Sequence, residues 1–150
     1  MRVYLVIMDE TDEALVALRF AARRAVKTGG TVHIIAHVQQ QAFSAFGGIQ
    51  ATIEAEARDR AEVVATGAAG SIFHESGKMP TITVRVGDSV KVVHGYLAEH
   101  PEVAALVLGA APQGNPGPLV THFTAAAGSM PCPVFVVPGG LNQDDLERLS

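Results

Sequence analysis

A run of six apolar residues, Val103–Leu108, constrains the fold of this 150-residue chain more than any other feature. Such a run is typical of a β-strand that is covered on both faces. Gly109, Gly114 and Gly117 follow, and glycines let a backbone turn sharply and approach a ligand closely. Pro118 then suits the first turn of a helix, whose free N–H groups would face an anion. Two interpretations stay open: a ligand-binding loop, or a strand-to-helix connection that binds nothing.

The rest of the chain alternates in the same way between apolar runs and helical patterns. The helical patterns cover 12–27, about 49–73, 89–99 and 118–127, with one or two capped, acidic turns at 142–149, and 39–48 is a connection of uncertain form. On the second helix we expect an inward face of Ile49, Ile53, Ala57, Val64 and Ala68. The further strands are predicted at Val3–Met8, Thr31–Val38, Pro80–Val86 (half exposed, at an edge) and Val134–Val137.

This alternation predicts an α/β fold: a single domain over residues 1–150, with 141–150 as a tail. An open, twisted, five-stranded parallel sheet with helices on both faces is expected. If the strand order is 3-2-1-4-5, the order reverses between the first and fourth strands, where such sheets bind ligands. Asp9 and the 109–117 loop would then meet in one crevice.

Composition excludes several classes of function. The net charge of -4 argues against a nucleic-acid partner, and no apolar run is long enough to span a membrane. The single cysteine, Cys132, excludes an internal disulfide, so we expect a cytoplasmic protein and a packing role for this thiol.

The crevice is short of cations. No Lys or Arg occurs between Lys91 and Arg148, so a phosphate would meet only backbone N–H groups, Thr121 and His122 from this segment. The alternative role of Asp9 is to cap the turn before Thr11.

The sequence resembles the universal stress protein family along nearly its whole length. The resemblance rests on Val6-Ile-Met-Asp9, Ile35-Ala-His-Val38, Gly87-Asp88, Leu106-Val-Leu-Gly109 and Pro131-Cys-Pro-Val-Phe-Val-Val137. It looks like a divergent bacterial branch of that family. It implies an adenine nucleotide alpha hydrolase-like fold and a cytoplasmic homodimer in stress adaptation, paired through Val134, Phe135, Val136 and Val137. Some members bind ATP or AMP, and others do not.

The loop departs from the nucleotide-binding pattern of the family, Gly-x2-Gly-x9-Gly followed by Ser or Thr. Gly114-Asn-Pro-Gly117 matches the first pair, whereas Val120-Thr121 stands where the later pair falls. The resemblance implies that Asp9 contacts the adenosine portion and that Thr121 supplies a hydroxyl. The cofactor-binding candidates are Asp9, Gly109, Gly114, Gly117 and Thr121. The expected ligand is ATP or AMP, with magnesium only for a triphosphate.

Catalytic and metal signatures are absent from the sequence. There is no Gly-x-Ser-x-Gly elbow and no P-loop, and no two of the six histidines stand at a metal-ligand spacing, so no metal site is predicted. His37 is expected to be a hydrogen-bonded core residue. A receiver domain is disfavoured because no acceptor aspartate follows the third strand. Three functions remain open: a stress-related dimer that binds a nucleotide or smaller anion, a ligand-free structural dimer, and a slow nucleotide hydrolase.

Overall fold

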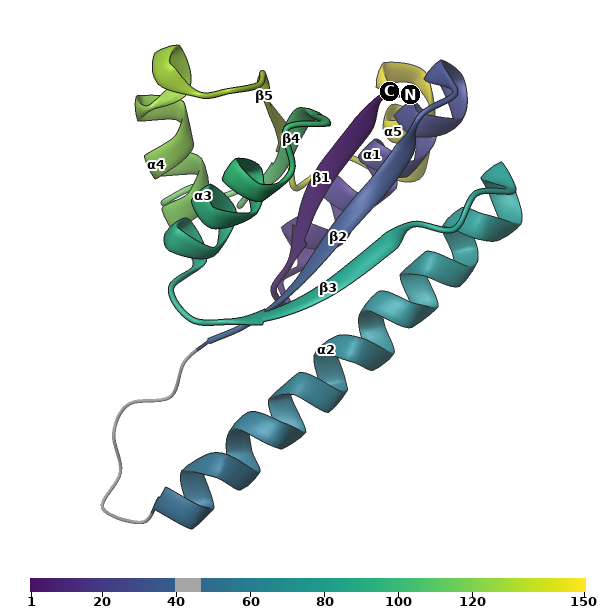
Figure 1. Cartoon of the computed structure of the whole chain (residues 1–150). Coiled ribbons are helices and arrows are strands. Elements are labelled where there is room, and N and C mark those ends of the chain that lie inside the picture. The colour runs from purple at the N-terminus through teal and green to yellow at the C-terminus, as the bar shows by residue number, and fades with distance from the viewer. Residues whose placement is uncertain (40–46) are drawn as a thin grey trace.

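The computed structural model describes residues 1–39 and 47–150, and it contains one parallel sheet with helices on both faces (Figure 1). The predicted connection 39–48 lies largely outside these residues. The strands are β1 (Val3–Met8), β2 (Thr31–Val38), β3 (Thr81–Val86), β4 (Val103–Ala110) and β5 (Val134–Pro138). The helices are α1 (Asp12–Thr28), α2 (Gly47–Ser76), α3 (Ser89–Glu99), α4 (Pro118–Ala125) and α5 (Gln143–Leu149), with a 3-10 turn at Ala127–Ser129.

The strand order is β3-β2-β1-β4-β5, which confirms the predicted topology. β1 is central and pairs in parallel with both β2 and β4, in registers such as Leu5 with His33 and Leu5 with Leu106. Its six residues are all buried, as expected for a strand covered on both faces. β3 and β5 form the two edges of the sheet.

Two apolar layers hold the helices onto the sheet. On one face, Leu5, Leu106 and Ile35 pack with Val93 and Tyr96 of α3 and with Phe123 of α4. On the other face, β-strand side chains pack with α1, with the alanines of α2 and with Leu146 of α5. Side chains alternate along each strand, so odd-numbered residues of β2 face α3 and even-numbered ones face α1 and α2.

The helix boundaries follow local chemistry. Thr11 caps α1, accepting a hydrogen bond from the backbone N–H of Ala14, and Gly29 ends the helix with φ 68°. Asp88 caps α3 through the N–H of Lys91, and Asn142 caps α5 through the N–H of Asp145. Among the described residues, none of the helices combines the length and apolarity that a membrane crossing requires.

Three sequence predictions need correction. The expected inward face of α2 is wrong at Ile53 and Val64, which are 43% and 40% exposed. Small residues instead face the sheet, because Ala61, Ala65 and Ala69 let α2 pack closely; Ile49 lies outside the residues whose side chains are described. β4 continues two residues beyond its predicted end at Leu108, through Gly109 to Ala110, and α4 ends at Ala125 rather than Ala127.

Candidate functional site

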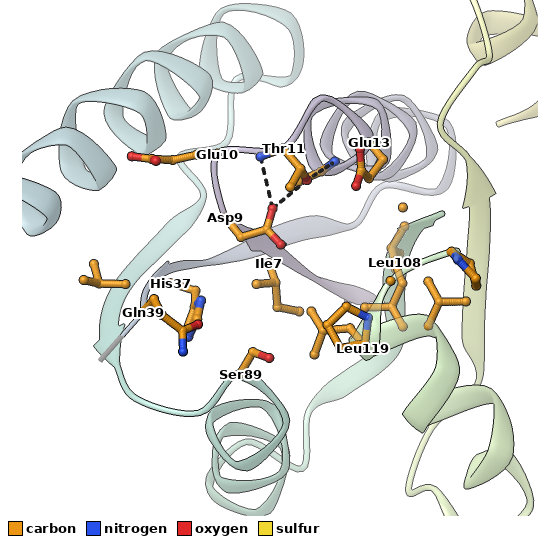
Figure 2. Close-up of a pocket in the computed structure, with 18 of the residues that line it drawn as sticks. Ile7, Asp9, Glu10, Thr11, Glu13, His37, Gln39, Ser89, Leu108 and Leu119 are labelled. Atoms are coloured by element: carbon orange, nitrogen blue, oxygen red, sulfur yellow. Dashed lines mark hydrogen bonds between the residues drawn. The ribbon is translucent and has the colours of Figure 1, made fainter. Parts of the chain in front are cut away.

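A cavity of about 340 Å³ opens at the carboxyl ends of β1 and β4, where the strand order reverses. Its walls come from the ends of β1, β2 and β4, the starts of α1, α3 and α4, and one side of α2. In Figure 2, Asp9 lies near the middle of the wall, with His37 and Gln39 at left, Ser89 below and Leu119 at right. Its volume lies at the lower end of the range for small-molecule sites.

Asp9 is held in place by the start of α1. The backbone N–H and the hydroxyl of Thr11 both donate to Oδ1 of Asp9, at 3.2 and 2.6 Å (Figure 2). Thr11 in turn accepts the N–H of Ala14 at 3.2 Å. Asp9 therefore orders the turn before α1, and it also lines the cavity.

Glu10 follows in a strained backbone conformation. Its φ of 69° lies in the left-handed region, and it is the one non-glycine residue with positive φ in the described part of the chain. Such strain is common where a backbone serves a site. Here it turns the chain sharply between the end of β1 and the cap of α1, so that Asp9, Glu10 and Thr11 all line the cavity.

Gly109 lies where α1 crosses β4. A Cβ atom at this position would stand 2.0 Å from the carbonyl oxygen of Glu13, far inside any real contact. The residue lines the cavity, but its lack of a side chain is explained by the close approach of α1. The sequence pattern alone does not distinguish such a packing glycine from one that makes room for a ligand.

The start of α4 presents free donors to the cavity. Gly117, with φ 116°, is the N-cap residue and has no side chain with which to cap, and Pro118 has no N–H. The next two N–H groups belong to Leu119 and Val120, and both residues line the cavity. The N–H of Gly117 itself donates to Oδ1 of Asn115 at 2.8 Å, so it is already satisfied.

Two predicted site residues do not line the cavity. Gly114 is exposed in the loop with φ 72°, a conformation that favours glycine. Thr121 is exposed on the first turn of α4, and its N–H bonds the carbonyl of Gly117 at 3.0 Å. Asp9, Gly109 and Gly117 are therefore brought together at the cavity, whereas Gly114 and Thr121 lie outside its lining.

Arg60 of α2 supplies a positive charge that was not predicted from the sequence. Among the residues described, it is the one Lys or Arg that lines the cavity, and its Nε donates to Oε1 of Glu10 at 3.3 Å. Its position follows from the long α2 helix passing the end of β2, which no local motif indicates. Against this one cation stand three carboxylates, those of Asp9, Glu10 and Glu13.

His37 is a hydrogen-bonded core residue, as predicted. It is 8% exposed, and its Nε2 lies 2.6 Å from the carbonyl oxygen of Gly87, to which it donates. The bond ties the end of β2 to the turn after β3, and the ring forms part of the cavity wall.

Comparisons with known proteins agree with this architecture. The model of the Universal stress protein family matches residues 1–138. The universal stress protein UspA from Lactobacillus plantarum superposes with a TM-score of 0.79 at 18% identity, over 91% of this chain and 97% of that one. No curated protein sequence matches.

Two further similar structures carry nucleotides. One is a universal stress protein in complex with cAMP (TM-score 0.57, 15% identity, 91% and 96% coverage). The other is a universal stress protein from Archaeoglobus fulgidus in complex with dAMP (TM-score 0.53, 18% identity, 91% and 97% coverage). At these identities the likeness establishes the fold.

Proposed function

Because the chain belongs to the universal stress protein family, we propose that it binds an adenine nucleotide with a single phosphate group, AMP or a close analogue, in the cavity between β1 and β4. The proposal includes a homodimer that acts in stress adaptation. The observation that carries it is the meeting of Asp9 with the uncapped start of α4 in one cavity. Two structures of similar fold hold cAMP and dAMP, each with one phosphate.

The phosphate is placed at the start of α4. The N–H groups of Leu119 and Val120 and the positive end of the helix dipole favour an anion there. Asp9, held by Thr11 through one carboxylate oxygen, has its second oxygen for a hydroxyl or amine of the adenosine portion. Gly109 and Gly117 complete the wall, while Gly114 and Thr121 stay predictions without a direct contact.

The charge balance favours one phosphate over three. Arg60 is exposed and paired with Glu10, and three carboxylates line the same cavity. A triphosphate would add several negative charges to this set, and so it would need magnesium. AMP needs only the N–H groups and Arg60.

Calorimetric titration of the whole chain with AMP tests this proposal. We expect saturable binding of AMP, with ATP binding more weakly unless magnesium is present. Asp9→Asn keeps the size of the side chain and an acceptor for Thr11 but removes the charge, and it should weaken AMP binding about 10-fold or more. Arg60→Gln should weaken it a few-fold, whereas Arg58→Gln, a neighbouring exposed arginine on the same helix, should not change it.

The glycines offer a second matched pair. Gly117→Ala strains a cavity-lining residue with φ 116°, and Gly114→Ala strains a residue outside the cavity with φ 72°. Only the first should weaken AMP binding. If AMP, cAMP and phosphate all fail to bind at millimolar concentration, the nucleotide proposal is wrong. The remaining proposal is then a structural dimer without a ligand. Two observations favour it: the N–H of Gly117 already donates to Asn115, and Gly109 is required by the close packing of α1.

The dimer is proposed to form through β5, the edge strand. Leu106 donates its N–H to Pro133 and Gly139 donates its N–H to Ala110, so alternate residues of β5 bond to β4. The backbone groups of Val134 and Val136 therefore face outward, where they can pair with a second copy across a two-fold axis. Val136 is also 39% exposed.

Light scattering after gel filtration tests the interface. Val136→Lys should convert the dimer to a monomer, while Val63→Lys, at a 72% exposed position on α2, should leave the dimer intact. Phe135 is a poorer probe, because its ring packs against Phe20 and Arg24 of its own α1. A Val136→Lys protein of unchanged mass would place the interface elsewhere.

A further inference from the structure

Three side chains of types that can ligate a metal meet at the opposite end of the sheet from the cavity between β1 and β4. His33 is the third residue of β2, His100 directly follows α3, and Glu102 directly precedes β4. One ring nitrogen of each histidine and one carboxylate oxygen of Glu102 all lie within 4.8 Å of one another. The cavity lies at the carboxyl ends of the strands, whereas this cluster lies at the amino ends of β2 and β4.

The cluster has an ordered geometry. Nδ1 of His100 lies 2.9 Å from Oε1 of Glu102, on the two sides of Pro101. The His100 ring stacks on Tyr96 at 4.0 Å between centroids and 21° between planes, and it meets the His33 ring edge-on at 5.9 Å. Stacking and the rigid proline thus hold His100 and Glu102 toward His33.

We propose that His33, His100 and Glu102 form a binding site for a divalent transition metal, with Zn²⁺ the best fit. Two imidazoles and one carboxylate are a donor set that zinc accepts, with a fourth position left open for water. Tetrahedral zinc with ligands at about 2.0–2.2 Å needs donor atoms about 3.4 Å apart. The distances in the cluster reach this value by small rotations, since Glu102 is exposed and His100 is half-buried.

Tyr96 supports the site from behind. Its hydroxyl lies 2.8 Å from Nδ1 of His33 in the buried interior, so it fixes the plane of that ring. When Nδ1–H donates to the Tyr96 oxygen, Nε2 is the nitrogen for the metal, which is the usual arrangement around a ligating histidine. This contact is a second observation in favour of a binding site, because the buried Tyr96 and the backbone of β2 together hold the His33 ring in a single orientation.

A bound metal would join β2 to the connection between α3 and β4. These segments are 67 or more residues apart in the chain, and His33 lies in a buried strand while His100 and Glu102 lie at the surface. The site is independent of the proposed nucleotide cavity, because it shares no residue with it.

Titration of the metal-stripped protein with Zn²⁺, and separately with Co²⁺ followed by visible absorption, tests the site. We expect one ion per chain, a higher melting temperature with Zn²⁺ and the absorption bands of Co²⁺ bound to nitrogen and oxygen donors. His100→Ala and Glu102→Gln, both at exposed or half-buried positions, should each weaken Zn²⁺ binding at least about 10-fold. Tyr96→Phe should weaken it less and shift the Co²⁺ spectrum.

His94→Ala is the matched control. His94 and His122 form a second histidine pair, with Nε2 atoms 2.9 Å apart, on the exposed surface of α3 and α4. The proposal is overturned if no ion binds, if His100→Ala and Glu102→Gln bind as the wild type does, or if His94→Ala alone abolishes binding. AMP titration of the same variants should be unchanged, which separates this site from the proposed function.

Discussion

Gly109→Ala separates a packing glycine from a ligand-binding one. The new Cβ would stand 2.0 Å from the Glu13 carbonyl oxygen and 2.6 Å from its carbon, whereas real Cβ contacts essentially never fall below 3.0 Å. α1 and β4 must therefore move apart by about 1 Å. Both obstructing atoms are backbone, so no side-chain rotation relieves the contact.

The expected cost follows from this displacement. Overpacking a tight interior costs typically about 1–3 kcal/mol, and a backbone obstruction belongs at the upper end, about 2–3 kcal/mol. For a domain of this size the melting temperature should fall by roughly 4–12 °C. The shift also moves Glu13 relative to Thr11 and Asp9, so AMP binding should weaken as a consequence of the packing change.

Urea unfolding at a fixed protein concentration measures this cost, since the proposed dimerisation would couple the free energy of unfolding to concentration. Gly95→Ala is the control: Gly95 lies within α3, where an added Cβ would have no atom within 4 Å, and alanine there should stabilise by up to about 1 kcal/mol. The substitution of glycine by alanine should thus lower the free energy of unfolding at position 109 and raise it at position 95. If the free energy of unfolding of Gly109→Ala lies within about 0.5 kcal/mol of the wild-type value, the packing argument is refuted. Room for a ligand would then be the better explanation of this glycine.

Three further outcomes are expected. Burial raises the pKa of the Cys132 thiol, so Cys132 in the native protein should react with a disulfide reagent far more slowly than in urea. Because the thiol of the unfolded chain ionises at lower pH, the free energy of unfolding should fall as pH rises past the ordinary thiol pKa. Cys132→Ala should remove this fall. Leu146→Ala, at a 1% exposed position of α5, should lower the free energy of unfolding in urea by about 2–3 kcal/mol. Leu149→Ala, at a 48% exposed position of the same helix, should lower it by under about 0.5 kcal/mol. Equal losses would mean that α5 does not pack on α1 in solution. Glu10→Gly should stabilise by about 0.5–1 kcal/mol in the same assay by relieving a left-handed φ, and a loss of stability would show that the ion pair with Arg60 outweighs the strain.

The strands and their order were predictable because the pattern of apolar and polar residues within each segment indicates its type of secondary structure and its burial. Runs such as Val103–Leu108 indicate strands covered on both faces, and Thr11 and Asn142 mark helix starts by a chemistry that acts over three residues. The face of α2 was not predictable from apolar periodicity. Small alanines rather than Ile53 and Val64 face the sheet, and close packing selects for size as well as hydrophobicity.

The candidate site was predictable only in part, for a related reason. Asp9 and the loop before α4 were expected together, because the strand order fixes which carboxyl ends are neighbours. Arg60 was not, since its position depends on where a long helix passes the end of β2. The cluster of His33, His100 and Glu102 was missed because no spacing within the sequence reports which side chains two strands and a turn bring together.

The parallel pairing of β1 with β4 also sets the order of events during synthesis. Val3 pairs with Val103, so during synthesis β1 lacks one of its two neighbours until a hundred residues later. At about 5–20 residues per second, β1 waits on the order of 5–20 seconds for β4 with one apolar edge unpaired. Contacts of such long range also slow folding of the finished chain. The crevice between β1 and β4 therefore forms only after residues as far apart as Asp9 and Val120 have been made, and a ligand bound there would report that β1, β4 and the start of α4 have come together.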